Sequence, residues 1–248
     1  MTLYVALLAC GFLAALLVYR YDLYNREPSY MLLLTAGLGA LAMKVGGSVE
    51  LLALTRLGID DRVGLAAVAA LVEECVRFVL VGLIAFSSRH FDDPMDGLVY
   101  GSVAGLGMGL EESFYLLDLA REPNILSLPV ELVRLLGHVV LGGIACFGLG
   151  LWRVRSEGYR STAIRTFLVA VGLHLLWDWV ALGAEDAMLA PWLAAAAVAI
   201  MLAGLLYYGR LVVEGSERSR RVFSRLPVKK LWGWPFDVLF DPRGSRSS

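Results

Sequence analysis

The stretch from Val130 to Trp152 reads VELVRLLGHVVLGGIACFGLGLW. It holds two charged residues, Glu131 and Arg134, and one histidine, His138, in an otherwise mostly apolar run. At about 1.5 Å per residue, a helix of this length reaches roughly 34 Å. The hydrocarbon core of a bilayer is about 30 Å thick. The stretch therefore predicts a helix that crosses a membrane.

Runs of this kind recur through the chain of 248 residues, which is 58% apolar and 18% charged, with a mean hydropathy of +0.67. Soluble domains are nearer to about half apolar and a quarter charged. We expect an all-α fold, a polytopic transmembrane helical bundle of about seven spans. The composition excludes a disordered chain, a collagen and a disulfide scaffold. The expected spans are 3–19, 30–54, 64–87, 95–119, 130–152, 163–183 and 188–209.

The second expected span is overlong, and it carries Lys44, Gly46, Gly47 and Glu50, which would permit a tilt or a break. We expect one transmembrane domain over residues 1–210, with a motif core at 65–182. Residues 211–248 form a tail that is basic and then aromatic, a composition suited to a membrane surface.

The arginines and lysines set the expected orientation. Arg153, Arg155 and Arg160 follow the fifth span, and the tail is also basic. The connection after the sixth span holds Glu185 and Asp186 and no base. We therefore expect a multi-pass protein of the cell membrane with a cytoplasmic C-terminus. The net charge of −1 gives no indication of a nucleic-acid partner.

Ionisable side chains inside the expected spans carry most of the functional information. Such a group costs several kcal/mol at bilayer depth, so it is rare and usually functional. Four successive spans carry them, and the set is Glu73, Glu74, Arg77, Glu111, Glu112, Arg134, His138, His174 and Asp178.

The spacing suggests pairs. Glu73 and Arg77 are four residues apart on one helix face, which favours an ion pair, and Glu74 lies about 100° around the helix from Glu73. His174 and Asp178 have the same spacing. Asp178 can accept from one imidazole nitrogen and leave the other free for a metal or substrate.

The depths of these groups agree. Measured from the end of each span that we expect to face outward, Glu73 and Glu74 lie at about 14 Å and His138 at about 12 Å. His174 lies at about 14 Å, and Glu112 at about 10 Å. Helices of alternating direction thus place polar groups at a similar level, which predicts one shared, water-accessible site in the outer half of the bilayer.

Carboxylates and histidines together are the parts of a hydrolytic site. A glutamate can act as a general base on water, and histidines with a carboxylate can hold Zn²⁺ and leave a position for that water. The sequence has no HExxH and no GxSxG motif, so the usual zinc-protease helix and the serine-hydrolase elbow are absent.

Four segments between residues 65 and 182 resemble, in order, the motifs of the PrsW-type intramembrane proteases, which are grouped with CAAX-protease-like membrane enzymes. Residues 73–77 resemble E-E-x-x-K/R. Residues 92–113 resemble D-x-P-x-D-G-x-V-Y-G followed by G-L-G-F-A-x-x-E-N. His138 with Gly142 matches H-x-x-x-G, and residues 174–178 match H-x-x-W-[ND].

The resemblance implies an intramembrane endopeptidase that cuts membrane-anchored proteins such as an anti-sigma factor. It implies that Glu73 and Glu74 carry catalysis, with Asp178 orienting His174. Arg77 stands where the family usually has lysine. Glu111 neighbours Glu112 and is the other candidate for the later family glutamate. As site groups, or as ligands of zinc or another divalent metal, it implies Glu112, His138 and His174.

Other functions fit the same residues. A non-catalytic descendant of the family would bind membrane proteins as a scaffold and would tolerate Glu74→Gln. A transporter coupled to protons or cations would use the carboxylates as a relay. The absence of visible inverted repeats counts against the transporter. Structural ion pairs and buried hydrogen bonds are the non-functional alternatives for the glutamates and histidines.

Overall fold

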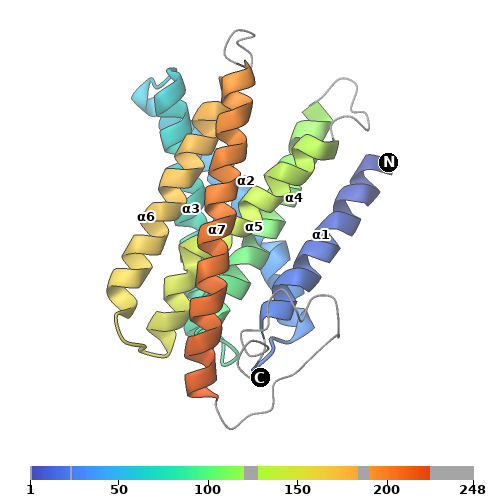
Figure 1. Ribbon diagram of the computed structural model, residues 1–248. Coiled ribbons are helices and arrows are strands. Elements are labelled where there is room, and N and C mark those ends of the chain that lie inside the picture. Colours follow the sequence, from blue (N-terminus) through green and yellow to red (C-terminus); the bar gives the residue numbers. More distant parts are fainter. Residues whose placement is uncertain (1, 23, 120–127, 184–189, 224–248) are drawn as a thin grey trace.

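The computed structural model describes the chain except for residues 1, 23, 120–127, 184–189 and 224–248. The described part contains seven helices and no strand, which confirms the expected all-α bundle. The helices pass up and down the molecule in alternation (Figure 1). Their bounds are α1 Thr2–Tyr21, α2 Ser29–Leu57, α3 Arg62–Ser87, α4 Asp96–Leu119, α5 Leu128–Arg153, α6 Tyr159–Ala181 and α7 Ala190–Val222.

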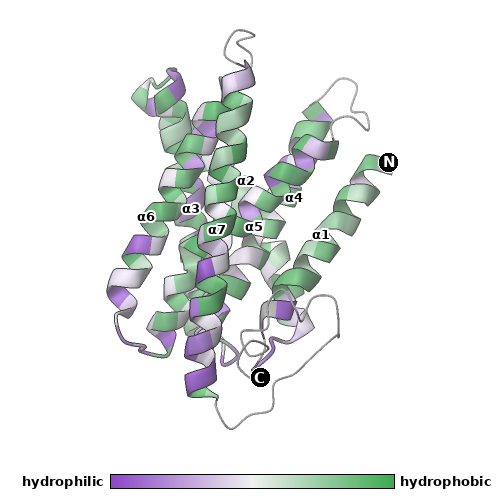
Figure 2. Ribbon diagram, in the orientation of Figure 1, coloured by the Kyte–Doolittle hydropathy of each residue, from purple (hydrophilic) through white to green (hydrophobic). Residues whose placement is uncertain are grey.

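Five of these helices, α1, α2, α5, α6 and α7, are long and apolar enough to cross a membrane. Figure 2 shows hydrophobic residues along the helices and hydrophilic ones gathered at the lower ends of α6 and α7. We call the end where α1 stops and α2 begins the lower end, and the opposite end the upper end (Figure 1). The helical membrane protein expected from the sequence is thus supported.

Two helices differ from expectation. α2 is continuous from Ser29 to Leu57, so the glycines at 46 and 47 do not break it. α7 continues to Val222, past the boundary expected at residue 210. The basic and aromatic part of the tail from residue 224 onward lies outside the described residues.

Helix α4 runs through the middle of the bundle and is buried along most of its length. Glycines on one face bring it against α5. A Cβ at Gly101 would lie 2.2 Å from the carbonyl oxygen of Gly142, and one at Gly105 would lie 2.0 Å from that of His138. On another face, a Cβ at Gly107 would lie 1.9 Å from the oxygen of Ala36 in α2. α4 is therefore held between α2 and α5 at backbone contact.

Buried carboxylates join several segments at the lower end. Asp96 Oδ2 accepts from the backbone N–H of Asp92 and Asp93, at 2.6 and 2.7 Å. Asp22 Oδ2 accepts from the N–H of Glu27 at 2.7 Å. Asp22, Glu27, Asp93 and Asp96 are each at most 2% exposed.

Two further bonds extend this lower acid cluster of Asp22, Glu27, Asp93 and Asp96. Tyr100 of α4 donates to Glu27, and Ser219 of α7 donates to Asp93. Burial raises the pKa of Asp22 to about 8 and that of Glu27 to about 7. The cluster therefore ties the connections before α2 and before α4 to the lower part of α7, at the cost of burying acids.

Candidate active site

The site lies in the upper half of the bundle, where α3, α4, α5 and α6 bring their polar side chains together. Counting along the helices, Glu73 lies about 16 Å below the start of α3, and His138 about 15 Å below the start of α5. His174 lies about 10 Å below the end of α6. The side chains that meet there are Glu73, Glu74, Arg77, Glu112, His138, His174 and Asp178.

Arg77 is fully buried at the base of the site. It donates to Glu74, and its second terminal nitrogen lies 3.0 Å from Nδ1 of His138. The ion pair expected between Glu73 and Arg77 is wrong, because Arg77 pairs with Glu74 instead. Residues three apart are helix neighbours as much as residues four apart. Glu74 faces Arg77 because both point inward, toward His138 and His174.

Three acids surround the ring of His174. Its Nδ1 donates a hydrogen bond to Oε1 of Glu74 at 2.9 Å. Nε2 then points at Oε2 of Glu73, 3.8 Å away, and at Oδ2 of Asp178, 3.5 Å away. Glu74, rather than Asp178, therefore occupies the orienting position, and Asp178 lies on the open side of the ring.

His138 has a partner on each ring nitrogen. Its Nδ1 accepts from Arg77, and its Nε2 lies 2.6 Å from Oε2 of Glu112. Arg134, on α5, lies 3.5 Å from the other oxygen of Glu112. The rings of His138 and His174 are nearly perpendicular, with centroids 6.0 Å apart. His138 is thus fixed between a buried cation and a carboxylate.

Glu73 is buried between the two imidazoles. Its Oε2 lies 3.8 Å from Nε2 of His174 and 3.9 Å from Nδ1 of His138. This oxygen, like Oδ2 of Asp178, is buried without a hydrogen-bond partner in the described part of the chain. Buried polar atoms almost always have partners. Two unpartnered oxygens beside one free imidazole nitrogen therefore indicate a position for a bound group.

The site opens toward the upper end. The side chains of Glu112 and Asp178 are 26% and 21% exposed, whereas that of Glu73 is 7% exposed. The exposure of the site side chains therefore falls from the upper end down to Glu73. The side chains predicted to lie at a similar depth do meet, in the upper half of the bundle.

The structure separates the two neighbouring glutamates of α4. Glu112 contacts His138, whereas Glu111 forms an ion pair with Lys44 of α2 at 3.0 Å. One acid was missed by sequence reasoning as a site residue. Glu50 of α2 interacts electrostatically with Glu112, His174 and Asp178. Glu50 could have been found by the criterion that selected the other site residues, because it is an ionisable side chain inside a predicted span.

The donor atoms suit a divalent metal in type. In the described residues, no group of three or more His, Cys, Asp and Glu side chains already converges as ligands on one point. The unpartnered oxygens of Glu73 and Asp178 nevertheless lie within 3.8 Å of the free Nε2 of His174. Nitrogen and carboxylate oxygen are ligands that Zn²⁺ accepts. The donor types, though not a closed ligand set, therefore suit a divalent metal.

Comparison with known proteins gives a family match over most of the chain. A family model described as PrsW family intramembrane metalloprotease matches residues 27–207. The chain is 35% identical over 120 residues to Protease PrsW of Geobacillus kaustophilus (strain HTA426), covering 47% of this chain and 51% of that protein. It is 28% identical over 173 residues to Protease PrsW of Bacillus subtilis (strain 168), covering 67% of this chain and 77% of that protein. The match thus spans about half the length of the first relative, and no solved structure matches significantly.

Proposed function

The chain belongs to the PrsW family of intramembrane metalloproteases, and we propose that it is an intramembrane endopeptidase. Its substrates would be membrane-anchored proteins, of the anti-sigma-factor type that the family resemblance implies. The observation that carries this proposal is the buried, unpartnered oxygen of Glu73 between two imidazoles, in a site that opens toward the upper end.

Glu73 is proposed as the general base. Its free oxygen Oε2 lies between the two imidazoles and can take a proton from a water placed between it and His174. Glu74 is engaged by Arg77 and His174, so its part is to hold the ring of His174. Such an orienting carboxylate fixes which imidazole nitrogen carries the proton.

Arg77 is proposed to stabilise, through its fixed positive charge, the negative charge that develops on the scissile carbonyl oxygen. Its N–H donors are already engaged, and His138 is proposed to hold it in place. Glu112 bonds His138, and Arg134 bonds Glu112, so His138 is held in place from the upper side.

For the metal implied by the family, the proposed ligands are His174 and Asp178, and Glu73 beside them stays free as the general base. The sequence-based set of His138, His174 and Glu112 shares His174 with it. The bonds of His138 to Arg77 and Glu112 favour the first set. When bound, zinc or another divalent ion would lower the pKa of water and polarise the carbonyl.

The upper end is proposed to face outward. The Lys and Arg residues gather at the lower end, and basic residues favour the cytoplasmic side. The described ones there include Arg153, Arg155, Arg160, Arg218, Arg220 and Arg221. This orientation gives a cytoplasmic C-terminus and a cut in the outer half of the membrane.

Membrane proteomics tests the proposal. Cells would carry the wild type, Glu73→Gln, or the matched control Glu111→Gln, at equal expression. Truncated single-pass proteins with new ends in the outer half should appear with wild type and the control, and should be absent with Glu73→Gln. Identical fragment patterns with a folded Glu73→Gln protein would overturn the proposal. A scaffold would then be tested by co-purified membrane proteins, and a transporter by ion-dependent solute flux.

A further inference from the structure

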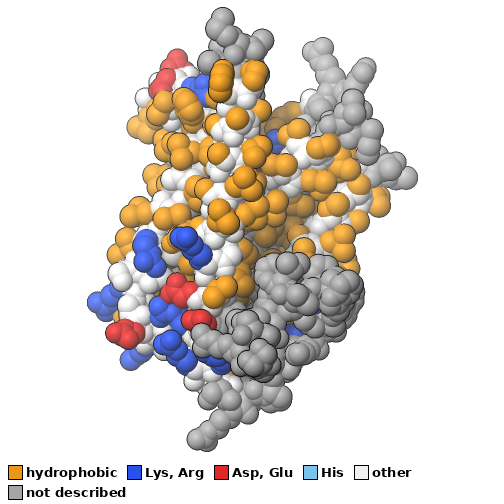
Figure 3. Space-filling view, in the orientation of Figure 1, with side chains coloured by type: hydrophobic (Ala, Val, Ile, Leu, Met, Phe, Trp, Pro, Cys, Tyr) orange, Lys and Arg blue, Asp and Glu red, His pale blue; other side chains and the backbone are white. Residues whose placement is uncertain are grey.

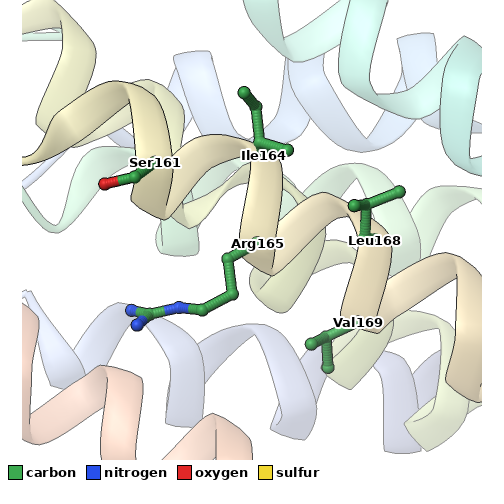
Figure 4. A pocket seen from close by; sticks show the side chains of 5 residues that line it. All are labelled: Ser161, Ile164, Arg165, Leu168 and Val169. Atoms are coloured by element: carbon green, nitrogen blue, oxygen red, sulfur yellow. The ribbon is translucent and has the colours of Figure 1, made fainter.

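A shallow hollow lies on the surface of α6 in its lower half. Ser161, Ile164, Arg165, Leu168 and Val169 line it. Their spacing of three and four residues places them on one face of the helix. Figure 4 shows Arg165 extending toward the Ser161 end, away from Leu168 and Val169. The hollow therefore has an apolar upper part and a cationic lower part.

Arg165 lies where the apolar surface gives way to charge. It is six residues into α6, about 9 Å from the lower end of that helix. Figure 3 shows a band of hydrophobic side chains over the upper and middle parts of this face, with Lys and Arg side chains gathered below it. A long cationic side chain at such a boundary reaches toward the lipid headgroups while its stem stays in the apolar layer.

The register of α6 against α7 places a second arginine at this level. Leu173 of α6 lies 3.9 Å from where a Cβ of Gly204 in α7 would be. Nearer the lower end, Arg218 of α7 donates to Ser156, just before α6, at 2.8 Å. Because the two helices are antiparallel, both contacts put Arg210 within about one helical turn of the level of Arg165.

Both arginines are exposed, and neither makes an ion pair or a side-chain hydrogen bond within the described residues. By contrast, Arg77, Arg134 and Arg218 each pair with a carboxylate. A cation at the level of the lipid headgroups is attracted to anionic lipid. A lipid phosphate lies at this depth and carries the complementary charge.

We propose that the hollow on α6 is a binding site for an anionic phospholipid. The phosphate lies at the guanidinium of Arg165, and one acyl chain runs upward along Ile164 and Leu168. Arg210 adds a second positive charge at the same depth. This proposal rests on the chain lying in a bilayer and not on its proteolytic activity.

Native mass spectrometry of the purified full chain in mild detergent tests the site. The probes are phosphatidylglycerol, phosphatidylcholine and inorganic phosphate. We expect wild type to retain phosphatidylglycerol in preference to phosphatidylcholine, with no displacement by millimolar phosphate. Because a cation near an anionic lipid surface contributes about 1 kcal/mol, Arg165→Gln and Arg210→Gln should each lower this retention about fivefold.

The matched control is Arg153→Gln, which removes an exposed arginine at the same end of the bundle but on α5. We expect it to retain phosphatidylglycerol as wild type does. Equal loss with Arg153→Gln would show that total charge, not this hollow, binds the lipid. Equal retention of phosphatidylcholine, or displacement by phosphate, would also overturn the proposal. Unchanged melting temperatures of the variants show that folding is not the cause.

Discussion

Arg77 is fully buried, and each nitrogen of its guanidinium has a partner: Met108 Sδ at 3.3 Å, Glu74, and His138 Nδ1 at 3.0 Å. A planar fork with fixed donors can hold three partners at once, which a lysine ammonium does in a different geometry. The residue thus links both histidines of the site, one directly and one through Glu74.

The first prediction concerns this charge. Arg77→Met leaves Glu74 buried without its counterion, and breaking a buried pair costs about 3–5 kcal/mol. We expect a clearly lower melting temperature of the purified protein in detergent. The half-exposed Arg134, replaced by Gln, is the control and should cost much less. A variant that melts like wild type would show that Glu74 finds another cation.

The second prediction concerns the metal. His174→Ala removes the nitrogen that faces Glu73 and Asp178, so we expect the bound divalent metal per protein, measured by elemental mass spectrometry, to fall to near zero. Glu111→Gln should bind as wild type, because Glu111 pairs with Lys44 away from the site. Equal metal content in the His174 variant would exclude this ligand set.

For single residues, the sequence indicates which side chains lie together. Charged side chains at the same membrane depth avoid lipid by facing the interior of the bundle. The sequence leaves open which glutamate pairs with Arg77, since neighbours three and four residues apart are both in reach. The positions of His138 and His174 on other helices decide it. Glu50 became a neighbour of the site only through the packing of α2.

Among the helices, the contact of α4 with α5 does most to position the site. A Cβ at Gly105 would lie 2.0 Å from the carbonyl oxygen of His138, a backbone atom that cannot turn aside. Close helix approach of this kind relies on small residues. Gly101, Gly105 and Gly109 recur every four residues, a spacing that predicts this close packing.

The third prediction follows from that contact. Gly105→Ala should force α4 and α5 apart, displace His138, and destabilise the protein by about 1–3 kcal/mol. The melting temperature measures the destabilisation, and the yield of cleaved fragments measures the effect of displacing His138. Gly82→Ala is the control, because nothing lies within 4 Å of a Cβ there. If Gly105→Ala has the melting temperature and activity of the wild type, then α4 and α5 lie farther apart than the 2.0 Å separation implies.

The seven helices of the described residues coincide with the predicted apolar runs, most with ends within a few residues. The exceptions have physical reasons. The apolar composition ends near Arg210, but α7 continues beyond it. Its lower part is held by hydrogen bonds from Arg218 to Ser156 and from Ser219 to Asp93. α2 runs unbroken through Gly46 and Gly47, and its Lys44 forms an ion pair with Glu111 of α4.

Over the whole molecule, the lower acid cluster couples stability to pH. Burial raises the pKa of Asp22 from 3.8 to about 8 and also raises the pKa of Asp93. The folded state therefore holds protons that the unfolded chain has released above about pH 4. This contribution to stability is complete below pH 4 and is lost as the pH rises through about 8.

The fourth prediction is that the melting temperature of wild type falls between pH 5 and pH 9. Asp22→Asn, which keeps an oxygen for the N–H of Glu27, should reduce this slope. Melting temperatures of both purified proteins, measured from pH 5 to pH 9, give the two slopes. A flat wild-type profile, or equal slopes, would contradict the assignment of the protons to this cluster.

The role of Glu73 in peptide-bond hydrolysis inside the membrane is tested with purified protein in liposomes and a single-pass substrate identified by the membrane proteomics. The appearance of the new N-terminus is followed by mass spectrometry. We predict that wild type produces it, with the cut in the outer half of the bilayer, and that Glu73→Gln, with unchanged melting temperature, produces none. Cleavage by Glu73→Gln at the wild-type rate would show that Glu73 does not carry the hydrolysis.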